Sequence, residues 1–286
     1  MSTASLVSPS VPLRQDATII GIVGLAHASS HFSHLLLPLL FPVFMREFGL
    51  SKSELGLLMS VFFVVSGLGQ AGAGFVVDRL GARRVLFAAE ALFITACLGA
   101  ALVQGYAGLL AVAVLAGLGN APFHPVDFTI LNQRVSVPRL GHAFSAHGLT
   151  GNLGWAVAPV FLVGIGSLAG WRGAYVAAAL MYAVILILLL LQRDKLHTEV
   201  MVRQPQHAGG SDLAFLKLPV VWWCFGFFML STMTLALVQN YAVSLLQVLH
   251  GVSMEAATLT LTAYMLCAAT GIVVGGFVAA RQAAHI

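Results

Sequence analysis

The stretch from Gly74 to Arg84 reads Gly-Phe-Val-Val-Asp-Arg-Leu-Gly-Ala-Arg-Arg, and it lies where one apolar run, Leu57–Val77, gives way to another, Val85–Leu102. A helix needs about 20 apolar residues to cross the hydrocarbon core of a bilayer, so each run is long enough to span it. Gly81 permits a tight reversal because glycine tolerates a positive φ. The stretch therefore predicts a short, charged turn between two membrane helices.

The composition of the chain indicates the same setting. Of 286 residues, 59% are hydrophobic and only 8% are charged, with a mean hydropathy of +0.94. A soluble domain carries about 25% charged residues. The formal charge is +4, but the basic residues punctuate apolar runs, which excludes a nucleic-acid-binding surface. The three cysteines, Cys97, Cys224 and Cys267, lie far apart and exclude a disulfide framework or a cysteine-rich zinc site.

Hydropathy predicts an all-α membrane protein with eight spans. The spans are Ile19–Met45, Leu57–Val77, Val85–Leu102, Leu109–Leu131, His142–Ser167, Ala174–Leu191, Val220–Leu246 and Ala256–Ala280. A long polar stretch separates the first six from the last two. We therefore expect a complete six-helix half over residues 1–191, a cytoplasmic linker over 192–219 and part of a second half over 220–286.

Basic residues fall on alternate sides of these spans. Eleven of the 14 lie on the side of the N-terminus, namely Arg14, Arg79, Arg83, Arg84, Arg134, Arg139, Arg193, Lys195, Arg203, Lys217 and Arg281. Cytoplasmic loops carry such an excess of lysine and arginine. We expect a multi-pass protein of the cell inner membrane with both termini in the cytoplasm and the loop near Tyr106 outside.

An internal repeat connects the two parts. Residues 74–79 resemble residues 276–281 at an offset of 202, and each copy closes an even-numbered span. Many transporters consist of two such halves, with the substrate held at the midplane between them. We therefore expect a second half that extends past Ile286. On this interpretation the chain is truncated after its eighth helix and cannot transport alone, but pairs with another copy or with the missing helices.

The loop also resembles the signature loop of the major facilitator superfamily. The residues that match are Gly74, Asp78, Arg79, Gly81, Arg83 and Arg84. The resemblance implies a major-facilitator-type helical bundle in which this loop latches the cytoplasmic gate. A simple positive-inside anchor would explain the arginines but not the glycine and aspartate spacing. Gly74 is expected to allow close helix packing, and Glu90, about one and a half turns beyond Arg84, to form an ion pair with this loop.

Two further stretches, Gly117–Pro125 and Gly148–Pro159, are similar to the fosmidomycin-resistance-like branch of that superfamily. This similarity implies a secondary active transporter, which favours efflux of a drug-like or anionic compound and would be driven by protons. Within the second stretch, Gly151, Gly154 and Pro159 also resemble the antiporter motif that efflux members of the superfamily carry in their fifth helix. Ala158 stands where that motif usually has glycine, so uptake of a small organic anion stays an alternative. A third alternative is a non-transporting fragment. The sequence has no nucleotide-binding loop, so nothing in it indicates ATP hydrolysis. Neither an enzyme nor a bound cofactor is expected.

The fourth span contains polar residues and two prolines. Pro122 and Pro125 remove amide donors and are expected to break the helix beside Asn120, a candidate for the substrate cavity. Polar groups within a membrane commonly mark transport pathways.

Asp127 is the leading candidate for proton coupling, because burial favours the protonated form of a carboxyl group. The alternative is a static ion pair with Arg134 or Arg139. His124 could share a proton with Asp127 or only orient a carbonyl group.

In the first span, His27, His31 and His34 are spaced by four and three residues, which places them on one helical face. These histidines could relay protons or hold an anion, or they could form a hydrogen-bonded seam between helices. No metal site is expected, because side chains from one helix rarely converge on an ion without other ligands. Four further polar residues are candidates to line the cavity: His147, Asn152, Gln239 and Asn240.

Overall fold

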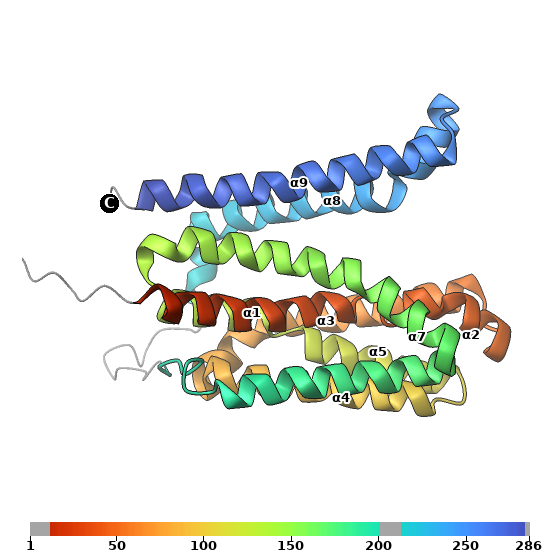
Figure 1. Ribbon diagram of the computed structural model, residues 1–286, viewed down its shortest axis with the longest axis horizontal. Coiled ribbons are helices and arrows are strands. Elements are labelled where there is room, and N and C mark those ends of the chain that lie inside the picture. The colour runs from red at the N-terminus through yellow and green to blue at the C-terminus, as the bar shows by residue number, and fades with distance from the viewer. Residues whose placement is uncertain (1–11, 201–212, 284–286) are drawn as a thin grey trace, which may run out of the picture. The chain divides into compact units, whose positions relative to one another are not determined.

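The computed structural model describes residues 12–200 and 213–283, and each regular element in that part is a helix (Figure 1). The chain forms two compact units, residues 1–201 with 272–286 and residues 202–271. The elements of the first unit are α1 (Leu13–Ser33), η1 (Pro38–Leu40), α2 (Phe41–Phe48), α3 (Lys52–Leu80), α4 (Ala82–Leu102), α5 (Tyr106–Asn120), α6 (Phe123–Arg134), η2 (Val137–Arg139) and α7 (Leu140–Leu191). This unit contains the six spans of the expected first half.

The turn between α3 and α4 forms as the sequence predicts. Gly81 has a φ of 83°, and α4 begins at the next residue. At its other end α3 begins with a capping box, in which the Ser51 hydroxyl accepts a hydrogen bond from the Glu54 amide and the Glu54 carboxylate accepts one from the Ser51 amide. The expected close packing at Gly74 was wrong, since a Cβ there would meet no atom within 4 Å in the described part of the chain.

The first span is not one regular helix. After α1 the chain passes through η1 and α2, because Pro38 and Pro42 lack the amide donors of a continuous helix. Tyr175 of α7 supplies a hydrogen bond within this irregular stretch, and Tyr182 of α7 supplies one to the regular helix before it. The Tyr175 hydroxyl donates to the carbonyl of Leu36 at 2.8 Å, and the Tyr182 hydroxyl donates to that of Ser29 at 3.1 Å.

The fourth span breaks where its prolines predict. α5 ends at Asn120, and α6 starts at Phe123 after a short turn that contains Pro122. The break lies midway along the apolar stretch Tyr106–Arg134, so it places the first turn of α6 near the middle of the span.

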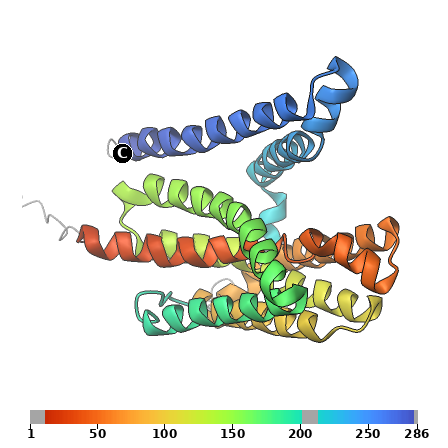
Figure 2. The same ribbon diagram turned by 45° about the vertical axis from the view of Figure 1, so that its right-hand side comes forward.

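α7 contains the predicted fifth and sixth spans. The chain reverses at Gly170, whose φ of 73° and ψ of 167° are not helical. The residues before and after Gly170 form two arms that run in opposite directions (Figure 2). The first arm packs against α1, and the second lies against both α1 and α4.

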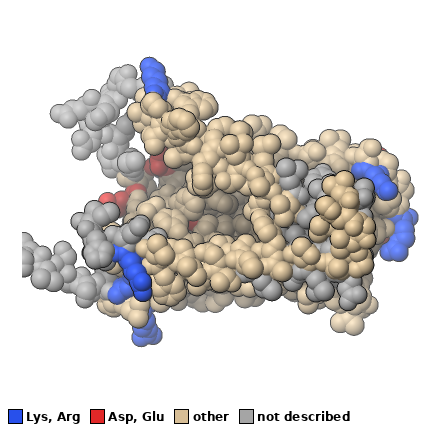
Figure 3. Space-filling model, turned by 90° about the horizontal axis from the view of Figure 1, so that it is seen from above, with Lys and Arg blue, Asp and Glu red and all other residues tan. Residues whose placement is uncertain are grey.

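Five helical stretches of the described residues are long and apolar enough to cross a membrane. They are Leu13–Phe48, Lys52–Leu80, Ala82–Leu102, Tyr106–Arg134 and Gly164–Leu191. Lysine, arginine, aspartate and glutamate take up little of the face drawn in Figure 3, and most of the side chains there are of other types. A scarcity of charged side chains is expected of an all-helical membrane protein.

The second unit holds η4 (Ala214–Lys217), α8 (Pro219–His250) and most of α9 (Met254–Ala283). α8 and α9 cover the predicted seventh and eighth spans, and their apolar segments include Pro219–Leu235 and Cys267–Val278. The assignment of residues 192–219 as a cytoplasmic linker stays a prediction.

α1 and the first arm of α7 approach closely along a seam of small residues. A Cβ on Gly154 would collide with the backbone carbonyl of Ala28, and one on Gly24 would lie 2.9 Å from Cγ2 of Thr150. Small residues let membrane helices come into backbone contact. The seam brings the polar faces of the two helices together.

Gly154→Ala should therefore destabilise the six-helix unit by about 1–3 kcal/mol, because its methyl group meets backbone that cannot give way. Thermal unfolding in detergent measures the effect. Gly164→Ala on the same arm is the matched control, since a Cβ there meets no described atom within 4 Å. Equal melting temperatures for the two variants would contradict the seam.

Candidate functional site

Six polar side chains gather near the middle of the first unit, and we call them the histidine cluster. They are His27, His31, His34, His124, His147 and Asp127. α1 supplies the first three, α6 supplies His124 and Asp127, and α7 supplies His147. The structure thus brings together residues that were predicted separately on three spans.

Asp127 is the centre of this cluster. Its Oδ2 lies 3.0 Å from Nδ1 of His27 and 3.1 Å from Nε2 of His147, and its side chain is fully buried. The His27 and His147 rings stack with centroids 3.5 Å apart. An ionised carboxylate only accepts hydrogen bonds, so both rings then donate through the nitrogens that face it. His27 thereby keeps Nε2 as its acceptor nitrogen.

The alternative for Asp127, a static pair with an arginine, was wrong. Nη1 of Arg139 donates to Oδ2 of the buried Asp16 at 2.6 Å, and Nε of Arg134 donates to the carbonyl of Lys195 at 3.2 Å. Asp16 thus anchors the start of α1 to the turn before α7, a pairing that the sequence analysis missed because the two residues are 123 positions apart.

A second hydrogen-bonded group joins the cluster through His34. Asn120 accepts a hydrogen bond from the Ser30 hydroxyl at 2.7 Å, lies 3.1 Å from Nε2 of His34, and donates to the Ser66 hydroxyl at 2.7 Å. Nε1 of Trp155 lies 3.3 Å from Nδ1 of His34 and donates to it. Asn120 therefore links α1, α3 and α5 where the fourth span breaks.

Three other residues were predicted to line the substrate cavity: Asn152, Gln239 and Asn240. Asn152 is half-buried and forms no side-chain hydrogen bond within the described residues. The side chains of Gln239 and Asn240 lie outside the described part of the chain. Nothing in the sequence singled out Ser66, which contributes only a small hydroxyl group on a long apolar helix.

The expected ion pair between Glu90 and the loop of residues 74–84 does not form. Glu90 is fully buried in α4, and its Oε1 accepts a hydrogen bond from the Ser29 hydroxyl at 2.8 Å, while its Oε2 has no partner among the described residues. The prediction assumed that Glu90 faces back along α4 toward the loop, whereas its carboxylate reaches Ser29 of α1.

The loop from Gly74 to Arg84, which resembles the superfamily's signature loop, lies against the segment that follows α7. Nη1 of Arg83 donates to the carbonyl of Arg193 at 3.0 Å, and the amide of Ala82 donates to Oγ1 of Thr198 at 3.1 Å. The role of Gly74, Asp78, Arg79, Gly81, Arg83 and Arg84 as a latch stays a prediction.

Comparison with known proteins identifies the family of this chain. The family model of the Major Facilitator Superfamily matches residues 23–284. The chain belongs to this superfamily. Among solved structures, the proton:xylose symporter XylE superposes on 92% of this chain and 69% of its own, with a TM-score of 0.70 and 16% sequence identity. The likeness confirms the major-facilitator fold.

Two bacterial proteins are similar to this chain in sequence. The fosmidomycin resistance protein of Escherichia coli is 23% identical over 96% of this chain, and the match covers 68% of that protein. The probable L-galactonate transporter of the same organism is 26% identical over 54% of this chain but over only 34% of its own length. The matched part is thus about a third of that transporter.

Asn120→Leu should destabilise the protein by about 2 kcal/mol or more, because it leaves the buried Ser30 and Ser66 hydroxyls without their partner. Asn152→Leu, which removes the same amide group where it makes no hydrogen bond, is the control. Thermal unfolding of both variants in detergent provides the comparison, and a loss no larger for Asn120→Leu than for the control would refute the network.

Proposed function

We propose that this chain acts in proton-coupled secondary active transport of a small organic anion across the cell inner membrane, by alternating access. The observation that carries the proposal is the hydrogen bonding of one buried carboxylate, Asp127, to two stacked imidazoles within apolar helical stretches long enough to cross a membrane. Intramembrane ionisable groups mark substrate and proton pathways. Transport, and not catalysis, is the activity that such a cluster supports in this superfamily.

The composition of the cluster supports coupling to protons. Within the described residues no lysine or arginine contacts it, and its only permanent charge is the carboxylate of Asp127. An anion that enters this region therefore gains a counter-charge only when an imidazole is protonated. Binding of the anion and binding of a proton then favour each other, and this linkage is what couples a proton gradient to transport.

The named relatives support an anionic substrate. L-galactonate is a carboxylate and fosmidomycin is a phosphonate, and one relative is named for each. Because anion and proton bind together in this scheme, an inward proton gradient drives uptake of the anion. Export, which the sequence favours, requires instead that proton and anion occupy the site in turn, so that they move in opposite directions. We further propose that both termini are cytoplasmic and that the loop from Gly74 to Arg84 stabilises the outward-facing state.

Asp127→Asn should abolish accumulation of the anion in response to a proton gradient but spare exchange of labelled for unlabelled anion, because the neutral amide no longer favours protonation of the imidazoles beside it. Proteoliposomes tested with L-galactonate and fosmidomycin, with either gradient orientation, measure both processes. Asp194→Asn, in an exposed segment, is the control. Full proton-driven accumulation by Asp127→Asn would overturn the coupling role.

Orientation is tested by cysteine labelling in a background without Cys97, Cys224 and Cys267. A membrane-impermeant thiol reagent added to intact cells should label Gln104→Cys, whereas Asp194→Cys should react only after the membrane is permeabilised. Both positions are exposed. The reverse pattern would show that the chain is inserted the other way round.

A further inference from the structure

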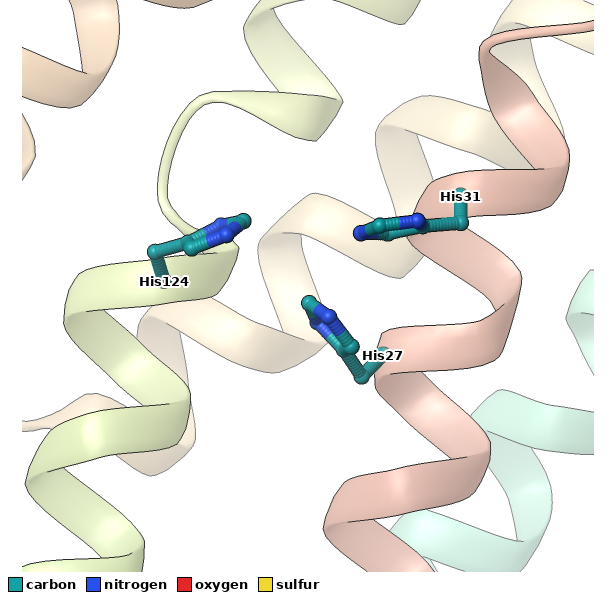
Figure 4. A group of neighbouring side chains, drawn as sticks. All are labelled: His27, His31 and His124. Carbon is teal, nitrogen blue, oxygen red and sulfur yellow. The ribbon is translucent and has the colours of Figure 1, made fainter. Parts of the chain in front are cut away.

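Three imidazoles of the cluster converge on one another from two helices. His27 and His31 project from α1, and His124 projects from the first turn of α6 into the space between them (Figure 4). One ring nitrogen from each lies within 4.8 Å of the others. The expectation that no metal binds rested on the lack of ligands outside one helix, and His124 is such a ligand. We propose that His27, His31 and His124 bind a divalent transition metal ion such as Zn²⁺.

The hydrogen bond from His27 to Asp127 prepares His27 for this role. Because Nδ1 of His27 faces the carboxylate at 3.0 Å, its proton resides there and Nε2 carries the free lone pair. A carboxylate that accepts from the second nitrogen of a metal-binding histidine is a common feature of zinc sites, where it fixes the tautomer and the ring orientation. Asp127 thus acts as an outer-shell partner and offsets part of the ion's charge.

His31 supplies an independent indication of a missing ligand. Its Nδ1 is buried and has no hydrogen-bond partner among the described residues. A buried polar atom without a partner is costly. Gly151 of α7 explains why this nitrogen is not covered: a Cβ there would lie 2.9 Å from Nδ1 of His31 and 3.1 Å from Nε2 of His27. Both nitrogens therefore border the same side-chain-free position.

The donor set favours a borderline cation over Mg²⁺ or Ca²⁺, which prefer oxygen ligands. Zn–N bonds of 2.0–2.1 Å in a tetrahedron place two nitrogens roughly 3.3 Å apart. The rings need to close by no more than about 1.5 Å from their present spacing. No hydrogen bond in the described structure restrains the ring of His31 or His124, so both can turn toward an ion. A fourth position stays open for water or an anion.

A second set, His27, Asp127 and His147, also has its ligand atoms within 4.8 Å of one another. Its two contacts of 3.0 and 3.1 Å are hydrogen bonds, in which protons occupy the space between ring and carboxylate. We therefore assign Asp127 to the outer shell of the metal site. Substitution of Asp127 distinguishes the two sets, because its carboxylate is a direct ligand only in the second.

The test is metal binding by the purified 286-residue chain in detergent, carrying a tag without histidine and lacking the three cysteines. Zn²⁺ binding is followed by calorimetry, and Co²⁺ binding by the visible spectrum of a tetrahedral nitrogen site. We expect one ion per chain. His31→Gln and His124→Gln should each weaken binding more than 100-fold, whereas Asp127→Asn should weaken it roughly 10- to 100-fold, as outer-shell partners do.

Two further variants keep the inference testable if a ligand variant folds poorly. Gly151→Ala retains all three histidines but places a methyl group against two of the nitrogens, so it should also lose the tetrahedral Co²⁺ spectrum. His142→Gln removes a histidine of α7 outside the cluster and should bind like the parent chain. Absence of stoichiometric binding by the parent chain, or parent-like affinity in both His31→Gln and His124→Gln, would overturn the proposal.

A loss with Asp127→Asn as large as with His31→Gln would instead make the carboxylate a direct ligand and overturn the assignment of the three histidines. The inference goes beyond the proposed function and needs no transport measurement. Metal binding without anion transport, both by this chain and by a form extended by four further helices, would refute the proposed function alone. Transport without metal binding would refute the metal site alone.

Discussion

The hydrogen bonds from His27 and His147 to Oδ2 of Asp127 are the constraint on which the six-helix unit depends. A buried carboxylate in a membrane must be paired or neutralised, because no bulk water solvates it. Its two partners come from α1 and α7, while Asp127 lies on α6. One carboxylate oxygen thus joins three helices whose remaining surfaces are largely apolar, and it fixes which faces of those helices meet.

These contacts are possible only because the helix backbones come close. Gly154, two turns beyond His147, lies against the carbonyl of Ala28, and Gly151 lies against the imidazoles of His27 and His31. A larger residue at either position would push α7 away from α1 and separate His147 from Asp127. The glycines that let the two helices pack closely therefore also allow the polar cluster to assemble, since packing and polar pairing occur on the same helical face.

The sequence predicts the spans, the tight turn at Gly81 and the break beside Asn120 because each depends on residues that are neighbours along the chain. It also selects most of the cluster, since polar residues are rare within apolar runs. The partners could not be predicted, because Asp16 and Arg139, or Glu90 and Ser29, meet only through tertiary packing. Each mistaken pairing chose the arginine nearest in sequence, whereas burial joins a carboxylate to whatever donor the opposite helix supplies.

The cluster combines a rigid part with an adjustable part. His27, His34 and His147 each have a ring nitrogen in a hydrogen bond, whereas the rings of His31 and His124 have none within the described residues. Fixed groups set the position and charge of the site, and free rings can turn toward an occupant without breaking a bond. A proton, an anion and a metal ion would all make their first new contact with His31 or His124. Selectivity among these ligands then rests on the lone pair of His27 Nε2, which the bond to Asp127 keeps available.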